Sequence, residues 1–141
     1  MSYTEHPHIQ EWMASHESYV VESHYSVAFH RYLDSLPWLP SKIDWSELRH
    51  VFVSLEGGDD VDLKAIAETP IGRHRYTMVS YKAADAAILC RTEDAFRDAD
   101  VLYMRAPGPR YMCGAQLIDD SPVLSVEAFA EYDLPGFTVS L

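Results

Sequence analysis

Two prolines, Pro37 and Pro40, separate a part of the chain with helical periodicity from a part with strand periodicity. Before them, apolar residues recur at positions i, i+3, i+4 and i+7 in two stripes whose phases differ. This spacing predicts helices over residues 7–17 and 22–36, joined by a short break. Because proline cannot continue a helix, Pro37 and Pro40 end the second one. Helices followed by strands favour the α+β class.

After Pro40 the apolar residues alternate with polar ones or gather in short runs bounded by turn residues. These patterns predict strands over 51–55, 73–81, 87–91, 101–105, 111–118 and 137–141. Cap and turn residues predict short helices over 61–68, capped by Asp59 or Asp60, over 92–98, and over 126–132, capped by Ser125. We therefore expect two N-terminal helices packed on a mixed or mainly antiparallel sheet of about 5–6 strands, with short intervening helices and with the helices on one face.

The length of 141 residues suits a single globular α+β domain over residues 1–141, large enough to bury a core. The 48% share of hydrophobic residues is typical of a folded domain. The first residues contain neither a basic cluster nor an apolar run, and no stretch approaches the ~18 apolar residues of a spanning helix. We therefore expect a cytoplasmic protein that does not enter a membrane.

Cys90 and Cys113 each lie inside an apolar run, and neither belongs to a C-x-x-C pair. Free cysteine behaves as a small hydrophobic residue and is usually buried. Together with a reducing cytoplasm, this pattern favours two buried, reduced thiols. A disulfide between neighbouring strands is the alternative, because spacing along the sequence does not fix a distance in space.

Acidic residues outnumber basic ones: 22 Asp and Glu face 11 Lys and Arg, which gives a formal net charge of -11. Nucleic-acid binding needs a basic footprint, and docking on anionic lipid needs clustered Lys and Arg. The charge therefore argues against both partner classes. The excess is uneven, because residues 1–70 hold 12 acids and 4 bases whereas residues 71–141 hold 10 acids and 7 bases.

The densest acidic segment is 56–62, where a Gly-Gly turn lies among Glu56, Asp59, Asp60 and Asp62. A turn followed by a helix explains these acids, because carboxylates stabilise the first turn of a helix. A metal site with oxygen ligands is a second interpretation, although the spacing does not fit an EF-hand loop. A loop that binds a protein partner is the third.

The spacing of the histidines does not match a metal site on a helix. Five of the seven precede residue 31, but His16 and His24 are eight residues apart and His24 and His30 are six apart. A pair on one helix face needs a spacing of three or four. The chain also lacks a nucleophile elbow, a Walker A loop and a dinucleotide-binding glycine pattern. We accordingly expect no metal and no cofactor. Arg105 and Arg110 flank a proline-rich turn, where they either bind an anion or pair with surface acids.

The acidity, the small size and the missing catalytic motif favour a binding protein over an enzyme. Bacterial immunity proteins and antitoxins share this profile, which is an analogy of class and not of motif. In this hypothesis the chain neutralises a basic, toxin-like protein, such as a nuclease or a nucleotide-modifying effector, by covering its active site. Acids speed the encounter and an aromatic residue anchors the complex. The candidate partner-binding residues are Glu56, Asp59, Asp60, Asp62, Trp38, Asp119 and Asp120.

Two other functions are compatible with the sequence. A small enzyme or ligand-binding domain would hold its pocket between the helices and the sheet, with candidate groups His24, His30, His74, Tyr76 and Arg105. A structural subunit would instead add the strand at 137–141 to the sheet edge of a neighbouring molecule. We expect that strand to belong to the core of its own chain.

Overall fold

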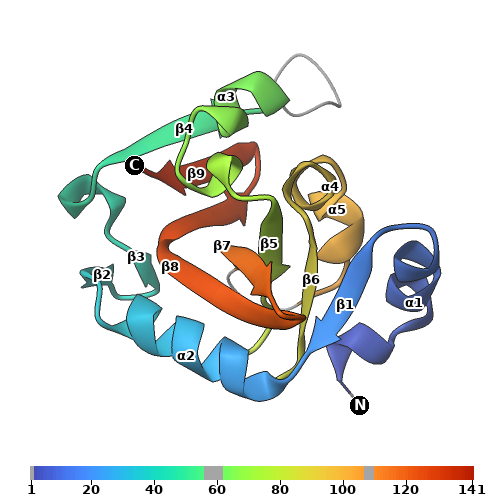
Figure 1. The fold of residues 1–141 in the computed structure, drawn as a ribbon. Coiled ribbons are helices and arrows are strands. Elements are labelled where there is room, and N and C mark those ends of the chain that lie inside the picture. Colours follow the sequence, from blue (N-terminus) through green and yellow to red (C-terminus); the bar gives the residue numbers. More distant parts are fainter. Residues whose placement is uncertain (1, 56–61, 107–109) are drawn as a thin grey trace.

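The computed structural model describes residues 2–55, 62–106 and 110–141, and its centre is a seven-stranded sheet (Figure 1). The strand order is β1-β6-β5-β7-β8-β9-β4, and every neighbouring pair is antiparallel. The expected α+β class with an antiparallel sheet is confirmed, although seven strands replace the expected number of about 5–6. The strands are β1 Ser18–Val21, β4 His50–Ser54, β5 Tyr76–Val79, β6 Ala87–Arg91, β7 Tyr111–Ile118, β8 Ser121–Asp133 and β9 Gly136–Ser140.

Helices cover both faces of this sheet. Along β6, Ile88 and Cys90 belong to one buried cluster whereas Ala87 and Leu89 belong to another, and alternate residues of a strand point to opposite faces. The first cluster also contains buried residues of the helices α1 Pro7–Ala14, α3 Leu63–Ala67, α4 Thr92–Arg97 and α5 Ala99–Leu102. The second contains residues of α2 Ser23–Asp34 and of a separate hairpin, β2 Trp38–Leu39 and β3 Lys42–Ile43. The expectation of helices on one face is therefore wrong, because the central strands are apolar on both sides.

The N-terminal part contains the two helices that the stripes predict, but a strand lies between them. α1 ends at Ala14 instead of residue 17 and buries Ile9 and Trp12. The expected short break contains β1, which pairs with β6 from Ser18↔Cys90 to Val21↔Ala87. Its Tyr-Val-Val composition is typical of strands, but its 4 residues are too few to show a clear alternation between the two helical stripes. β1 is one edge of the sheet, and β4 is the other.

The strand expected over 101–105 is wrong, because residues 99–102 form α5 and the chain then turns. Ala99 and Leu102 are buried on the side of this helix that faces the sheet. A short apolar run matches a helix of one turn as well as it matches a strand. Sequence periodicity alone therefore does not decide between the two.

The helix expected over 126–132 is also wrong, because this segment belongs to β8. Ala130 and Tyr132 are in the first buried cluster and Phe129 is in the second, so both faces of the strand are covered. An apolar run that is buried on both faces mimics helical spacing. The pairing of β8 with β7 shifts register between Cys113 and Gly114, which accommodates extra residues of β8.

β9 lies inside the sheet, between β8 and β4. Phe137 and Val139 have no exposed surface. At Gly136 a Cβ atom would lie 2.2 Å from the carbonyl oxygen of Val53, so the close approach of β4 requires glycine there. The expectation that the C-terminal strand belongs to the core is confirmed.

The two cysteines are buried and free. Cys90 lies on β6 and Cys113 on β7, with β5 between these strands, and they belong to different buried clusters. The prediction of buried thiols is confirmed, and the alternative of a disulfide between neighbouring strands is wrong. None of the described helices is long and apolar enough to cross a membrane.

Candidate functional site

Of the acids near residue 60, Asp62 lies within the described part of the chain. Its side chain caps α3, because Oδ1 accepts the backbone N–H of Ala65 at 3.1 Å. Asp62 is therefore the N-cap residue of α3, a role that the sequence assigned to Asp59 or Asp60. Glu56, Asp59 and Asp60 lie outside the described residues, and their part in partner binding stays a prediction.

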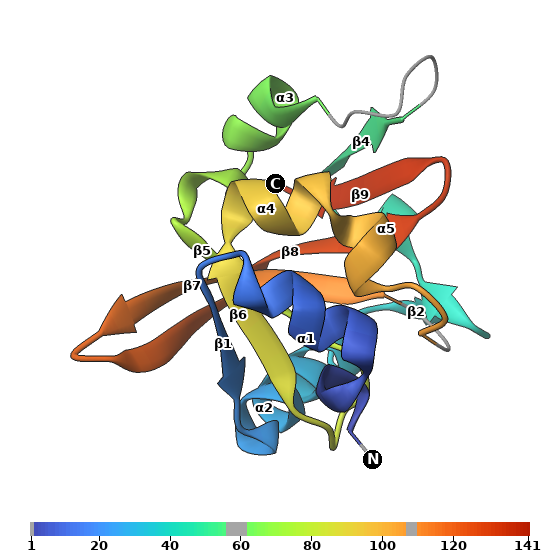
Figure 2. The same cartoon turned by 90° about the vertical axis from the view of Figure 1, so that its right-hand side faces the viewer.

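Asp119 and Asp120 form the turn of the β7–β8 hairpin, whereas Trp38 lies in β2. Figure 2 shows the hairpin projecting on the left of the view and β2 on the right. The Trp38 indole N–H donates to the carbonyl oxygen of Leu33 at 2.8 Å, which fixes the ring beside the C-terminal part of α2. The structure therefore brings the two aspartates together but places Trp38 on another part of the surface.

The tip of the β7–β8 hairpin extends beyond the sheet. The pairing of β5 with β7 ends at Tyr76↔Ala115, whereas β7 continues against β8 to the pair Ile118↔Ser121. Asp119 and Asp120 have positive φ values of 51° and 65°. Two left-handed residues between paired strands are typical of a type I′ turn, which matches the twist of a hairpin. The hairpin thus presents two carboxylates at its end.

The edge strand β1 runs beside this hairpin and exposes apolar side chains. Tyr19 is 43% exposed and Val20 is 51% exposed. Sheet edges normally carry Lys, Pro or a bulge, because an open apolar edge invites another strand to pair with it. β1 carries none of these protective features, and β6 is the one strand that pairs with it within the described part of the chain.

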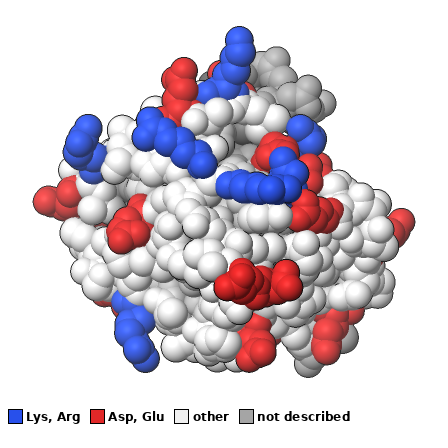
Figure 3. Space-filling view, in the orientation of Figure 1, with Lys and Arg blue, Asp and Glu red and all other residues white. Residues whose placement is uncertain are grey.

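A groove of about 430 Å³ lies between β1, the first turn of α2 and the β7–β8 hairpin. Two acids, Glu22 and Asp120, are its only charged lining residues within the described part of the chain. Figure 3 views the molecule from the side of the projecting hairpin, and acidic side chains are prominent on the lower half of this face. Apart from Ser121, the rest of the lining is apolar or aromatic: Tyr19, Val20, Val21, Tyr25, Leu89, Leu117 and Pro122.

Hydrogen bonds fix the rim of the groove. Oε2 of Glu17 accepts the hydroxyl groups of Tyr76 at 2.6 Å and of Tyr19 at 3.2 Å. The bond from Tyr76 lowers the pKa of Glu17 against a smaller opposing effect of burial, and the bond from Tyr19 and the nearby Arg75 and Arg91 lower it further. Tyr19 is therefore held by an ionised carboxylate, and its ring is preorganised at the edge of the groove.

A separate cavity of about 290 Å³ lies between α2 and the sheet, lined by His30, Asp34 and Trp38 among others. Nε2 of His30 lies 2.9 Å from Oγ of the buried Ser80. Burial lowers the pKa of His30, and the carboxylate of Asp34 opposes this effect. The position of this cavity matches the alternative hypothesis of a pocket between helices and sheet.

The other candidate groups of that hypothesis lie apart from His30. Nδ1 of His74 lies 2.8 Å from the carbonyl oxygen of Pro70, and Tyr76 is bonded to Glu17. His24 is exposed and lies 3.4 Å from Glu22. Within residues 2–55, 62–106 and 110–141, no group of three or more His, Cys, Asp or Glu side chains is arranged to hold a metal ion.

Sequence reasoning missed Tyr19, Val20 and Glu22 as candidate site residues. The two helical stripes predict only a break at this segment, so they do not indicate which of its side chains are exposed. The β-branched and aromatic residues at 19–21 were the available signal for an edge strand.

No known family model matches the chain, and neither a curated protein nor a solved structure shows significant similarity to it.

Proposed function

We propose that this chain is a bacterial, cytoplasmic binding protein of the immunity or antitoxin kind, which neutralises a basic protein partner by covering its active site. The observation that carries the proposal is the acid-lined apolar groove beside the open edge of β1. Apolar surface supplies affinity, and carboxylates at the rim select a basic partner and speed its arrival.

The geometry of the groove suits an extended segment. A partner strand that pairs with β1 continues the antiparallel sheet, and its main-chain hydrogen bonds give affinity without regard to sequence. Every second side chain of such a strand points toward the groove. In an alternating segment the side chains that face the groove are of one kind: apolar ones would contact Tyr19 and Leu117, or Lys and Arg would meet Glu22 and Asp120.

The projecting hairpin has a second part in the proposal. Its tip carries Asp119 and Asp120, and Ile118 and Val123 beside them are about half exposed. A narrow acidic projection with an apolar stem fits a cationic cleft, such as the active site of a nuclease. The same hairpin therefore borders the groove and reaches into the partner.

The test uses a model partner of defined chemistry: a peptide of about ten residues that alternates Lys and Val. Its matched control alternates Lys and Pro, which keeps the charge, whereas each proline lacks an N–H donor and is confined to a φ of about −65°, away from the geometry of an antiparallel strand. We expect saturable binding of the Lys-Val peptide alone, with amide shift changes along residues 18–22 and at the hairpin tip. Equal binding of both peptides would contradict strand addition and leave only non-specific charge attraction.

The charge variants test the same groove. Glu22→Lys with Asp120→Lys should slow association with the Lys-Val peptide about tenfold at low salt, with little effect at high salt. Glu11→Lys, an exposed acid on α1, is the matched control and should cause a much smaller change. If the double variant and the control behave alike, the groove is not the interface.

A small hydrolytic enzyme is a second candidate, because Ser80 and His30 are paired as a nucleophile and a base would be. Asp34, one turn further along α2, lines the same cavity as His30. A fluorophosphonate probe should then label Ser80, and Ser80→Ala should abolish labelling. Ser80 is only 1% exposed, which is why we rank this function second. A wild-type protein that stays unlabelled would contradict it.

A further inference from the structure

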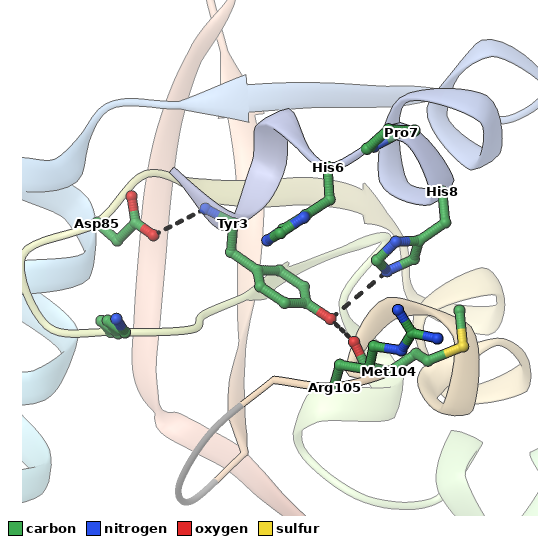
Figure 4. Close-up of a pocket in the computed structure, with 8 residues that line it drawn as sticks. Tyr3, His6, Pro7, His8, Asp85, Met104 and Arg105 are labelled. Atoms are coloured by element: carbon green, nitrogen blue, oxygen red, sulfur yellow. Dashed lines mark hydrogen bonds between the residues drawn. The ribbon is translucent and has the colours of Figure 1, made fainter. Parts of the chain in front are cut away.

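A third cavity lies near the N-terminus and shares none of the lining residues of the groove. Its volume is about 540 Å³, which is within the usual range of small-molecule sites. The short helix η1 (Tyr3–Glu5) and the start of α1 supply Tyr3, His6 and His8. The segment after α5 supplies Met104 and Arg105, as Figure 4 shows.

Tyr3 forms the floor of this cavity and is held in place from several sides. Its ring lies against that of Tyr81, with centroids 4.3 Å apart. Its hydroxyl donates to the carbonyl oxygen of Met104 and lies 3.5 Å from Nε2 of His8. Its backbone N–H donates to Oδ2 of Asp85 at 3.1 Å. The aromatic floor is therefore fixed before any ligand arrives.

The charged groups around the floor are predominantly basic. Lys82 and Arg105 are cations, and His6 and His8 become cations on protonation. The acid among the lining residues, Asp85, already accepts two backbone N–H groups, those of Tyr3 and Ala86. This local excess of positive charge stands in contrast to the net charge of -11.

Arg105 adopts a left-handed backbone conformation, with φ of 62°. It follows α5 in a turn that is closed by the N–H of Ala106, which donates to the carbonyl oxygen of Tyr103 at 2.9 Å. Glycine is the usual residue at such a place after a helix, because a Cβ atom makes this conformation unfavourable. The backbone does not require arginine there, and the guanidinium group of this strained residue lies beside the cavity.

Burial lowers the pKa of His8, and His6 and Arg105 lower it further. The other charged or titratable residues that line this cavity are Tyr3, Lys82 and Asp85. An anion between these groups would offset the repulsion from His6 and Arg105, and the pKa of His8 would rise.

We propose that this cavity binds a phosphate-bearing small molecule, whose phosphate contacts Arg105, Lys82 and His8 and whose apolar part lies on Tyr3 and Met104. Arginine and lysine are the usual partners of phosphate, and an aromatic floor favours a flat apolar group. This site is independent of the groove, so either proposal can fail without the other.

Calorimetric titration of the full chain with phenyl phosphate, inorganic phosphate and phenol tests the site. We expect phenyl phosphate to bind more tightly than either of the other two. Arg105→Gly and Lys82→Ala should each weaken its binding about tenfold or more, whereas Arg31→Gln, an exposed cation on α2, should leave it unchanged. Glycine is suited to the left-handed position, so loss of binding by Arg105→Gly is not explained by unfolding.

Nuclear magnetic resonance of the His8 ring supplies a second readout. Phenyl phosphate should raise the pKa of His8 in the wild type and leave it unchanged in Arg105→Gly. No saturable binding of phenyl phosphate up to ~10 mM would overturn the proposal. Equal affinity for inorganic phosphate and phenyl phosphate would overturn the role given to Tyr3 and Met104.

Discussion

Replacing the two left-handed acids at the hairpin tip, by Asp119→Asn together with Asp120→Gly, separates the stability of the chain from its proposed binding. The left-handed region costs an L-residue about 1–2 kcal/mol, and less for Asp and Asn. Glycine avoids this cost, but the greater entropy of the unfolded chain removes about 0.5–1 kcal/mol of the stability gained. Asn-Gly is also the preferred pair for this turn. The expected net gain is about 0.5–1 kcal/mol.

For a domain of this size, that gain raises the melting temperature by about 2–3 °C. Calorimetry or circular dichroism measures this shift, and titration with the Lys-Val peptide measures binding by the same variant. The variant removes two of the carboxylates that would meet the partner, so we expect binding to weaken while stability rises. A lower melting temperature would refute the assignment of the turn, and unchanged binding would refute the role of the two acids.

Three further predictions concern groups away from the groove. The Trp45 indole N–H donates to Oε1 of the buried Glu131 at 2.9 Å. Trp45→Phe should therefore lower the free energy of unfolding, measured by urea denaturation, by about 1–3 kcal/mol. A loss below ~0.5 kcal/mol would contradict the role of this bond. Burial raises the pKa of both cysteine thiols, so Ellman's reagent should label neither Cys90 nor Cys113 in the native chain and both after unfolding; rapid labelling of the native chain would contradict the fold. Burial lowers the pKa of His30, so the unfolded state binds the proton more readily than the folded state. The free energy of unfolding should therefore fall as the pH drops from about 7 to 5. His30→Gln should reduce this dependence of stability on pH, and an unchanged dependence would contradict the burial of the ring.

Elements with a distinct local pattern were predictable from sequence. The strands over 87–91 and 111–118 have the predicted bounds, because each is a short apolar run between clear turn residues. The helix over 22–36 was predicted within a few residues, because proline ends its stripe. β8 was not, because Val126, Phe129 and Ala130 match the spacing of a helix as well as that of a strand, and Ser125 is a typical helix cap.

The candidate groove was not predictable from the sequence, because it is assembled from distant segments. Glu22 precedes α2 and Asp120 lies in the β7–β8 turn, and the distance between them depends on the pairing of β1 with β6 and on the order of the strands between. The sequence identified Asp119 and Asp120 as candidate residues by their charge alone. It did not show that they lie beside an open apolar edge.

Hydrogen exchange along the two sheet edges tests the central proposal most directly. β4, with the exposed Val51 and Phe52, is the internal control, because it is also an edge but has no acid-lined groove among the described cavities. We expect the Lys-Val peptide to slow exchange of the outward-facing amides of β1 at saturation, with β4 unchanged and the Lys-Pro peptide without effect. Protection of β4 instead, or of neither edge, would contradict partner binding at β1.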